Sequence, residues 1–292
     1  MPINPPFPSP TKRWHNTAQP SASPTLPSLS SRGKSVLITG GGSTGIGGET
    51  ARYFAAAGAS RIALLGRRQG PLLDNKAYIE KTYPGVEVAV FTADVTRESD
   101  VENAFAAFAA GAKSKGENED GKIDVLVHSA ASIGPSEPAS IAPVSEYLDA
   151  ITANIAGAFH VARSFVRHTS SEGAVAVAIN SWGSYLSLNE AFSSYSVAKM
   201  AVYRLWDTIA VAHPHILVFH TQPGVVLTEM NLRTGGAESF ENVPIDDGAL
   251  SNRKFLWCNW DIDELKDRAS EIGEGTELNI SLVGWPRSSK EC

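Results

Sequence analysis

The sequence predicts an α/β protein built on a doubly wound parallel sheet. Short apolar runs recur along the chain between turn residues, which is typical of parallel strands buried on both faces. Longer segments with helical spacing separate these runs, and this alternation places helices on both faces of one sheet. Because ligands bind such sheets beyond the carboxyl ends of the strands, functional residues are expected in the turns that follow the strands.

Six apolar runs are expected to form strands. They are SVLIT at 35–39, IALL at 62–65, VEVAVFT at 86–92, IDVLVHS at 123–129, AVAVAIN at 174–180 and HILVFHT at 215–221. Helices are expected between them, beginning at Gly47, near position 74, at Glu98, at Ser145 and at Tyr195.

Residues 1–32 are rich in Pro and Ser and predict an irregular arm that is laid on the domain formed by 33–292. Phe7 and Trp14 are its candidate anchors. The arm lacks the apolar core of a signal peptide. Its lack of acids would also suit a transit peptide, but the prolines oppose the amphipathic helix that such a peptide forms.

Composition narrows the classes of function. The chain has 292 residues, 42% of them hydrophobic, which suits one large domain with a full core. A net charge of −6 and the lack of a block rich in Lys and Arg argue against a nucleic-acid partner. No apolar stretch approaches the roughly 18 residues of a membrane span. Two distant cysteines predict a reducing compartment, the cytoplasm, without a disulfide framework or a metal site.

The first turn, GGGSTGIGG at 40–48, has the context of a phosphate-binding loop because it follows a strand and opens a helix. Its first glycines let the chain bend with positive φ, and Gly45 and Gly47 leave room for a pyrophosphate at the helix N-terminus. The alternative is a plain tight turn. The candidate cofactor-binding residues here are Gly40, Gly42, Ser43, Thr44, Gly45 and Ile46.

The second strand is followed by Arg67 and Arg68, where a binder of NAD usually places an acid for the ribose 2′-hydroxyl. Guanidinium groups match a 2′-phosphate with forked donors, so the pair favours NADP(H) over NAD as the cofactor. Two solvated arginines are the alternative.

Two other turns carry candidate cofactor contacts. After the third strand, Asp94 and Val95 are candidate cofactor-binding residues. Asp94 could accept a hydrogen bond from the adenine amine, or it could cap the next helix. After the fourth strand, the small residues Ser129 and Ala130 let the backbone approach a cofactor. The adjacent His128 is interpreted as a core residue at the strand end.

Tyr195 and Lys199 lie four residues apart, ahead of an apolar helical run. Residues i and i+4 share one face of a helix, so the two side chains are expected side by side. A neighbouring ammonium favours the phenolate and lowers the pKa of a phenol from its reference of about 10, which makes a proton donor near neutral pH. The alternative is a surface helix with an ordinary Tyr and an ordinary Lys.

Together these features resemble the short-chain dehydrogenase/reductase family. The glycine turn, the small-residue turn after the fourth strand, Ser181 and the Tyr–Lys pair match it from Lys34 to about Met230. The segments RKFLWCNWDIDELKDRA, ISLVGWP and FPSPTKRWH resemble a fungal branch of it. The resemblance implies one Rossmann-type domain of about seven strands, acting on a small-molecule carbonyl or alcohol of secondary metabolism.

The resemblance also implies catalytic roles. Tyr195 would be the general acid/base, Lys199 would lower its pKa and bind the nicotinamide ribose, and Ser181 would polarise the substrate oxygen. Ser181 lies one residue further upstream of the tyrosine than is commonest, so Ser184 is the alternative serine. Asn154 matches an asparagine that holds a water or a helix distortion in the family; otherwise it is a polar break in a buried helix.

The turn QPGVVLTEM after the sixth strand matches the family as well. The resemblance implies that Pro223 and Gly224 shape the backbone there. It further implies that Val226 contacts the carboxamide of the cofactor and that Thr228 bonds to this carboxamide or to a phosphate.

The chain departs from the family in three places. Four residues separate Gly40 from Gly45, where the family usually has three. The sequence HSAA replaces the asparagine-bearing turn after the fourth strand. Only 25 residues separate Glu229 from Phe255, where the family normally has a substrate lid and a full helix, and the segment has little apolar periodicity. The lid near 229–254 is therefore expected to be shortened or loosely ordered. The lid region commonly contributes to the dimer face in the family, so the sequence leaves open whether the chain forms a homo-oligomer.

The predicted function is that of an NADP(H)-dependent oxidoreductase that interconverts a ketone and a secondary alcohol. Two alternatives use the same scaffold: a redox-neutral isomerase or cyclase, and a non-catalytic binding protein. Trp182, Tyr185 and Phe192 would suit a flat or apolar substrate if they line the site, or they are packing residues.

Overall fold

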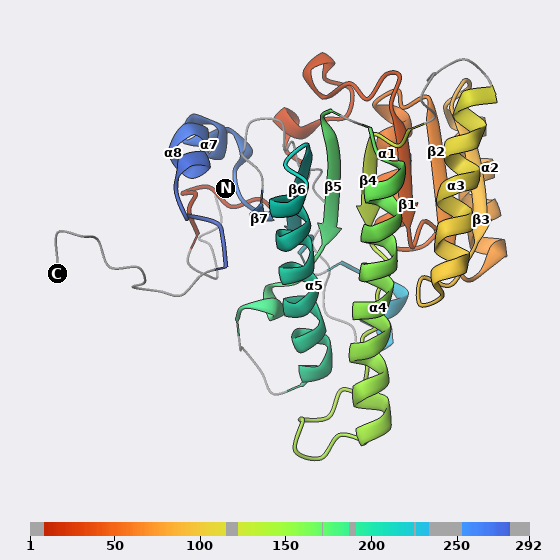
Figure 1. Ribbon diagram of the computed structural model, residues 1–292. Helices are drawn as coiled ribbons and strands as arrows, with labels where there is room; N and C mark the ends of the chain where they lie inside the picture. The colour runs from red at the N-terminus through yellow and green to blue at the C-terminus, as the bar shows by residue number, and fades with distance from the viewer. Residues whose placement is uncertain are drawn as a thin grey trace.

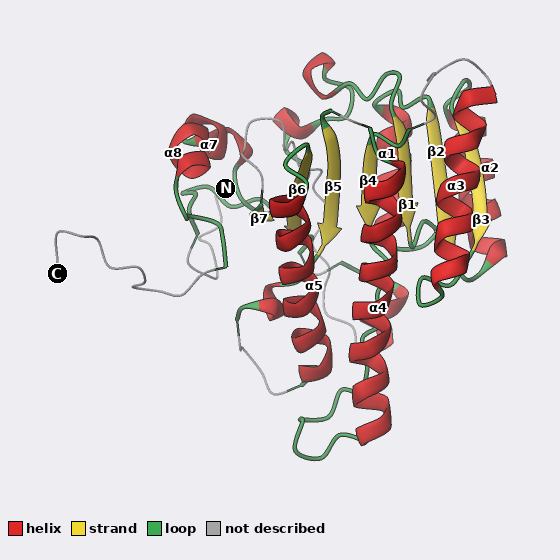
Figure 2. Cartoon of the chain, in the orientation of Figure 1, coloured by secondary structure: helices red, strands yellow, loops and turns green. Residues whose placement is uncertain are grey.

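The computed structural model describes residues 9–114, 122–170, 172–186, 191–224, 226–233 and 253–280. Seven parallel strands form one sheet in the order β3-β2-β1-β4-β5-β6-β7 (Figure 1). Helices cover both faces (Figure 2), which confirms the predicted doubly wound α/β fold. The strands are β1 (Ser35–Thr39), β2 (Arg61–Gly66), β3 (Glu87–Thr92), β4 (Val125–His128), β5 (Ala174–Ile179), β6 (Ile216–Gln222) and β7 (Lys254–Trp257).

All six runs expected to be strands are present, with ends that differ by at most two residues from the expected ranges. The seventh strand, β7, is the one that the apolar pattern did not locate. It has four residues and pairs with the end of β6, from Phe219 opposite Lys254 to Gln222 opposite Trp257. A run this short has no periodicity to detect, so its partner defines it.

Five long helices form the two layers. They are α1 (Ile46–Ala56), α2 (Gln69–Thr82), α3 (Glu98–Ser114), α4 (Val144–His168) and α5 (Ser193–Ala212). The first two pack on one face of the sheet and the other three on the opposite face (Figure 1). The remaining described helices are α6 (Glu229–Arg233), α7 (Ile262–Asp267), α8 (Ala269–Glu274) and the 3₁₀ turns η1 (Pro20–Ala22), η2 (Pro27–Leu29) and η3 (Trp182–Ser184).

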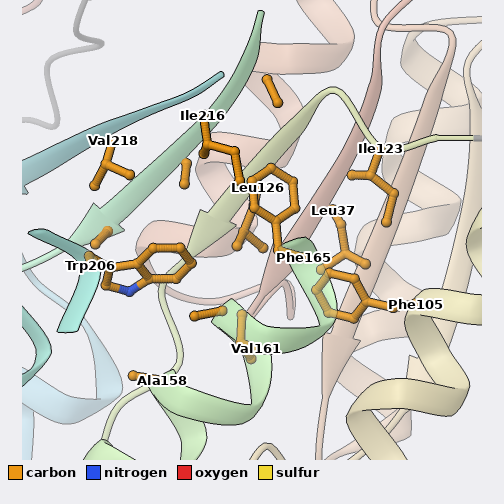
Figure 3. Close-up of a cluster of buried hydrophobic side chains, with 14 of the residues drawn as sticks. Leu37, Phe105, Ile123, Leu126, Ala158, Val161, Phe165, Trp206, Ile216 and Val218 are labelled. Carbon is orange, nitrogen blue, oxygen red and sulfur yellow. The ribbon is translucent and has the colours of Figure 1, made fainter. Parts of the chain in front are cut away.

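The larger core lies between the sheet and α3, α4 and α5. Figure 3 shows Leu37 and Leu126 from the sheet with Phe105, Phe165 and Trp206, one aromatic side chain from each of the three helices. All five are fully buried, and aromatic side chains contribute the largest buried areas of any residue type. This packing fixes α4 and α5 against the strands and so positions the residues that these helices present at the sheet edge.

The N-terminal arm lies against the segment that joins β7 to α7. Trp14 is buried, pairs with Trp260 in an antiparallel bridge, and places its ring 5.7 Å from that of Trp257. The Nε2 of Gln19 donates to the carbonyl oxygen of Trp260 (2.7 Å), and its Oε1 accepts from the N–H of Ile262 (2.9 Å). The other expected anchor, Phe7, lies outside the described residues.

The predicted lid, 229–254, is described only at its two ends, 229–233 and 253–254, so its expected shortening lies outside the described residues. Within the described ranges, no helix has both the length and the apolar character needed to cross a membrane.

Candidate active site

The candidate site lies at the carboxyl edge of the sheet, where a doubly wound fold binds ligands. Because the strands are parallel, the turns after β1 to β6 meet at this edge. Helix α5 is tied to the same place, since the Nζ of Lys199 donates to the carbonyl oxygen of Ile179, the last residue of β5 (2.7 Å). The structure therefore brings the predicted cofactor turns and the Tyr–Lys pair to one edge.

The glycine turn between β1 and α1 has the geometry of a phosphate cradle. Gly40 adopts φ +71°, and Gly45, directly before α1, adopts φ +108° with open space where a Cβ would stand. A Cβ at Gly47 would lie 2.5 Å from the carbonyl oxygen of Gly40, so the turn and the helix meet backbone to backbone. Among the described residues no side chain caps α1, and its first N–H groups are left for a ligand. The turn therefore fits a cofactor pyrophosphate.

The other predicted residues of this turn differ in exposure and bonding. The N–H of Ser43 donates to the carbonyl oxygen of Pro71 near the start of α2 (2.8 Å), so it is engaged within the chain. Thr44 is exposed, whereas Gly42 and Ile46 are half-buried.

A polar brace that sequence reasoning missed holds the longer glycine turn. Asn75 of α2 is fully buried, and its Nδ2 donates to the carbonyl oxygens of Gly41 (3.0 Å) and Gly48 (3.2 Å). Its Oδ1 accepts a hydrogen bond from the Nε of Arg52 on α1 (2.9 Å). The signal was available, because Asn75 lies three residues after the buried Leu72 and so shares its helix face.

The turn after β2 presents Arg67 and Arg68, both with exposed side chains. The Nη2 of Arg68 forms an ion pair with the Oε2 of Glu229 at the start of α6 (2.7 Å). This contact joins the turn after β2 to the turn after β6. Nothing in the local sequence of either segment indicates it.

Asp94 bonds within its own turn. Its Oδ1 accepts hydrogen bonds from the N–H (2.9 Å) and the hydroxyl (2.8 Å) of Thr96. These bonds, with the charges of Arg67 and Arg97, hold the pKa of the carboxyl below its ordinary value. Asp94 therefore stays a hydrogen-bond acceptor, and its bonds with Thr96 lie within its own turn, before α3 begins at Glu98.

Thr39, the last residue of β1, organises the turn after β4. Its Oγ1 accepts from the N–H groups of Ser129 and Ala130, both at 3.1 Å, and lies 3.2 Å from the Nδ1 of His128. Burial, with a contribution from the charge of Lys199, lowers the pKa of His128 to about 3, so the ring is neutral. His128 is thus the core residue expected, and Thr39 holds the turn after β4.

Tyr195 and Lys199 lie together on one face of α5, as their spacing predicts. The Nζ of Lys199 is 5.3 Å from the ring centroid of Tyr195. Lys199 is 3% exposed, and burial lowers its pKa to about 8. Burial also raises the pKa of the Tyr195 phenol. The expected acidification of Tyr195 is therefore absent from the chain by itself, because burial disfavours the charged phenolate.

The two candidate serines after β5 differ in where their hydroxyls go. Ser184 is buried, and its Oγ donates to the carbonyl oxygen of Ser181 (2.8 Å). Ser181 is half-buried, and its Oγ accepts from the N–H of Gly183 (3.2 Å), so its own proton can be directed to a substrate oxygen. Gln222, which sequence reasoning missed, steadies the segment by accepting from the N–H of Trp182 (2.8 Å). This geometry favours Ser181 over Ser184.

Asn154 ties α4 to the turn after β4. Its Oδ1 accepts from the N–H of Ser132 (3.0 Å), and its Nδ2 donates to the carbonyl oxygens of Ser132 and Ala150, both at 2.8 Å. It is buried with these bonds made, so it braces the site. Val95 packs on the same helix, where a Cβ at Gly157 would lie 2.8 Å from its side chain.

The turn after β6 places the last predicted residues. Pro223 is buried and Gly224 adopts φ +81°, which bends the chain at the sheet edge. Val226 is half-buried. The Oγ1 of Thr228 accepts from the N–H of Asn231 (3.1 Å), so in this structure it caps α6.

The three aromatic residues near the site do not share one role. Tyr185 accepts a hydrogen bond from the indole of Trp257 and packs edge-on against Phe255 at 4.9 Å, so it is a packing residue. Trp182 is half-buried and packs against the cluster that holds Trp257. Phe192, directly before α5, adopts a left-handed φ of 56°.

A cavity of about 360 Å³ lies between α1, the face of β4, β5 and β6, and the arm. It reaches the site edge at Ile46, Ile179 and Pro223. Ser181 and Tyr195 do not line it, so it is not the place where the hydroxyl groups meet a substrate. In the part of the chain that the structure describes, no group of His, Cys, Asp and Glu could hold a metal ion.

Comparison with known proteins points to one family. A family model described as short chain dehydrogenase matches residues 34–238. The short chain dehydrogenase/reductase AacuD of Aspergillus aculeatus is 26% identical over 268 residues, which cover 86% of this chain and 89% of that protein. The short chain dehydrogenase tazN of Aspergillus terreus is 30% identical over 286 residues, covering 90% of this chain and 59% of that protein. A crystal structure of a short-chain type dehydrogenase/reductase from Mycobacterium marinum matches with a TM-score of 0.61 and 27% identity, over 70% of this chain and 78% of its own.

Proposed function

Because this chain belongs to the short-chain dehydrogenase family, we propose that it is an NADP(H)-dependent oxidoreductase that interconverts a ketone and a secondary alcohol. The fungal relatives confirm the predicted branch of the family. The observation that carries the proposal is the placement of Tyr195 and Lys199 on one helix face, beside the strand end that precedes Ser181 and at the edge that holds the glycine turn.

The residues of the site would act on the substrate oxygen. A bound nicotinamide cofactor supplies the hydride, or accepts it in the reverse direction. The hydroxyls of Ser181 and Tyr195 would donate to the oxygen as it becomes negative, and preorganised donors of this kind are worth about 3 kcal/mol each. Tyr195 would pass its proton to that oxygen during reduction and take it back during oxidation, a contribution of about 10²–10⁴ in rate.

Proton exchange near neutral pH requires that the pKa of Tyr195 fall below the level that burial sets. The pKa of Lys199 is about 8, so its ammonium is mostly charged at neutral pH. That charge and the positive charge of an oxidised cofactor both favour the phenolate. We therefore propose that Tyr195 becomes a usable acid and base only in the cofactor complex.

The chain offers a group for each part of the cofactor. The glycine turn would hold the pyrophosphate, and Lys199 the nicotinamide ribose. Arg67 and Arg68 would hold the 2′-phosphate, which is the reason to propose NADP(H) rather than NAD. The cytoplasm as compartment, the small-molecule substrate of secondary metabolism and a homo-oligomeric state stay predictions.

Replacing Tyr195 with Phe tests the mechanism. We expect turnover of a panel of ketones, followed by NADPH consumption, to fall by about 10²–10⁴. The NADPH dissociation constant should stay within about two-fold of the wild type, because the phenol oxygen is not needed to hold the pyrophosphate. Tyr78→Phe, at an exposed tyrosine of α2, is the matched control and should keep full activity.

Each other outcome removes part of the proposal. Persistent activity of Tyr195→Phe would remove Tyr195 from the mechanism. Substrate conversion without NADPH consumption would favour the redox-neutral isomerase or cyclase. Failure of the wild type to bind NADPH would favour a non-catalytic binding protein.

A further inference from the structure

An ion pair crosses the edge where the cofactor is proposed to bind. Arg68 follows β2 and Glu229 opens α6 after β6, yet their side chains meet at 2.7 Å. In the order β2-β1-β4-β5-β6 the two strand ends are four spacings of about 4.8 Å apart, or about 19 Å. The two side chains cannot span that distance, so α6 must reach inward over the ends of the intervening strands. The pair therefore spans the proposed cofactor track.

Backbone hydrogen bonds hold Arg68 next to the glycine turn, and a capped helix start holds Glu229. The N–H of Gly40 donates to the carbonyl oxygen of Leu65 in β2, and the N–H of Ser43 donates to that of Pro71, each at 2.8 Å. These bonds place Arg68, which lies between Leu65 and Pro71 in the chain, at the border of the turn. Glu229 follows Thr228, whose hydroxyl caps α6.

We propose that Glu229 is a specificity-determining residue that competes with the 2′-phosphate of the cofactor for Arg68. This inference rests on the proposed function, since it concerns the same site. A phosphate monoester carries about −1.5 to −2 charge near pH 7 and accepts the forked donors of a guanidinium, whereas a carboxylate carries a single charge. The 2′-phosphate therefore replaces Glu229 when NADP(H) binds.

The exchange has a cost that differs between the two cofactors. Binding of NADP(H) breaks the Arg68–Glu229 pair, and the released carboxylate stays near the phosphate. Binding of NAD(H), which lacks that phosphate, leaves the pair in place. Glu229 consequently weakens the preference for NADP(H) over NAD(H), and removing its charge sharpens that preference.

The test measures binding rather than turnover. Dissociation constants for NADPH and NADH are measured by calorimetry on the wild type, Glu229→Gln and Arg68→Ala. Adenosine 2′,5′-bisphosphate and adenosine 5′-monophosphate isolate the adenine end of the cofactor. Glu98→Gln is the matched control, because Glu98 also forms an exposed ion pair, with Arg163 at 2.6 Å. The side chains of Glu98 and Arg163 are 52% and 44% exposed. Those of Glu229 and Arg68 are 44% and 64% exposed.

Glu229→Gln should lower the dissociation constants of NADPH and of the bisphosphate about two- to five-fold, the range that an exposed ion pair can contribute. The dissociation constants of NADH and of the monophosphate should not change in Glu229→Gln. In Glu98→Gln, none of the four dissociation constants should change. Arg68→Ala should weaken NADPH binding roughly ten-fold. In the double variant that also carries Arg68→Ala, Glu229→Gln should have no further effect on NADPH binding.

The unfavourable outcomes are distinct. If the wild type binds NADPH but Glu229→Gln changes neither cofactor, changes both equally, or weakens NADPH binding, the inference is wrong and the proposed function stands. The inference is also wrong, and the proposed function again stands, if Glu98→Gln lowers the NADPH dissociation constant as much as Glu229→Gln does. If the wild type binds neither NADPH nor NADH, the proposed function and the inference fall together.

Discussion

The residue that sets the electrostatics of the site is Lys199, a buried ammonium at the sheet edge. Burial and the charge of Lys199 lower the pKa values of His128 and His220 to about 3 each. Strand register places both histidines opposite Ala178 of β5, one on each side. Because both rings are neutral, Lys199 is the charged member of this buried group at neutral pH, and no neighbouring imidazolium disfavours its ammonium.

Lys199 should make the protein more stable as the pH rises from about 8 to about 10. Its pKa is about 8 in the folded chain, against 10.5 for an ordinary lysine. In this window the unfolded chain binds a proton that the folded chain has lost, so the free energy of unfolding increases with pH. The whole shift corresponds to about 3 kcal/mol.

Urea unfolding across this pH range checks the prediction. Lys199→Met should lose the slope, whereas Lys81→Met, at an exposed position of α2, should keep it. Parallel pH profiles for Lys199→Met and the wild type would show that the lysine titrates normally.

At the scale of the elements, α2 decides the shape of the glycine turn as much as β1 and α1 do. The backbone carbonyl oxygen of Gly41 in this turn needs a hydrogen-bond partner. Asn75 supplies that partner from α2 by bonding to Gly41, while its contact with Gly48 ties the same amide to α1. The sheet, both helices and the turn are therefore one unit around the proposed pyrophosphate site.

Replacing Asn75 with Ala should weaken NADPH binding about ten-fold, because the carbonyl oxygens of Gly41 and Gly48 lose a buried donor and the turn relaxes. The substitution should also cost about 1–3 kcal/mol of stability. Calorimetric binding and urea unfolding measure the two effects separately.

A control with a similar loss of stability separates positioning from general damage. Ser164→Ala removes a buried hydroxyl of α4 that donates to Glu102 (2.6 Å), away from the sheet edge. It should destabilise the protein without changing the NADPH dissociation constant. If both variants weaken NADPH binding equally, Asn75 has no specific part in shaping the turn.

At the scale of the whole molecule, the arm joins the two ends of the described chain. Trp14 and Gln19 bond to the segment after β7, and the buried Asp261 accepts hydrogen bonds from Arg13 (2.8 Å) and pairs with His15 (2.7 Å). Burial raises the pKa of Asp261, but the hydrogen bond from the N–H of Glu264, together with the hydrogen bond of His15 and the charge of Arg13, holds it below its ordinary value. The arm thus packs on the segment that follows the edge strand β7, while the N–H of Phe255 within β7 donates to the carbonyl oxygen of Leu278 (2.7 Å).

Trp14→Ala should destabilise the protein by about 3–5 kcal/mol, because loss of the buried indole leaves a cavity beside Trp257. Ser28→Ala, at an exposed position of the same arm, should change the free energy of unfolding by less than about 0.5 kcal/mol. Equal urea midpoints for the two variants would show that the arm contributes nothing to the stability of the domain.

The sequence by itself determined the features that a local window contains. Each strand from β1 to β6 is a short apolar run, so its position follows from its own residues, and parallel strands bring their following turns to one edge. The pairing of Tyr195 with Lys199 follows from helical spacing alone. This reasoning did not locate the strand β7, which has four residues and no periodicity, nor the short helices α6, α7 and α8.

Only the tertiary structure decided the features that join distant segments. These are the brace from Asn75 to the glycine turn, the Arg68–Glu229 pair across the sheet edge, and the different hydrogen bonds of Ser181 and Ser184. The raised pKa of Tyr195 belongs here too, since the spacing of Tyr and Lys predicts attraction but contains no measure of desolvation. Burial and long-range contact arise from packing, and packing is a property of the assembled sheet and helices.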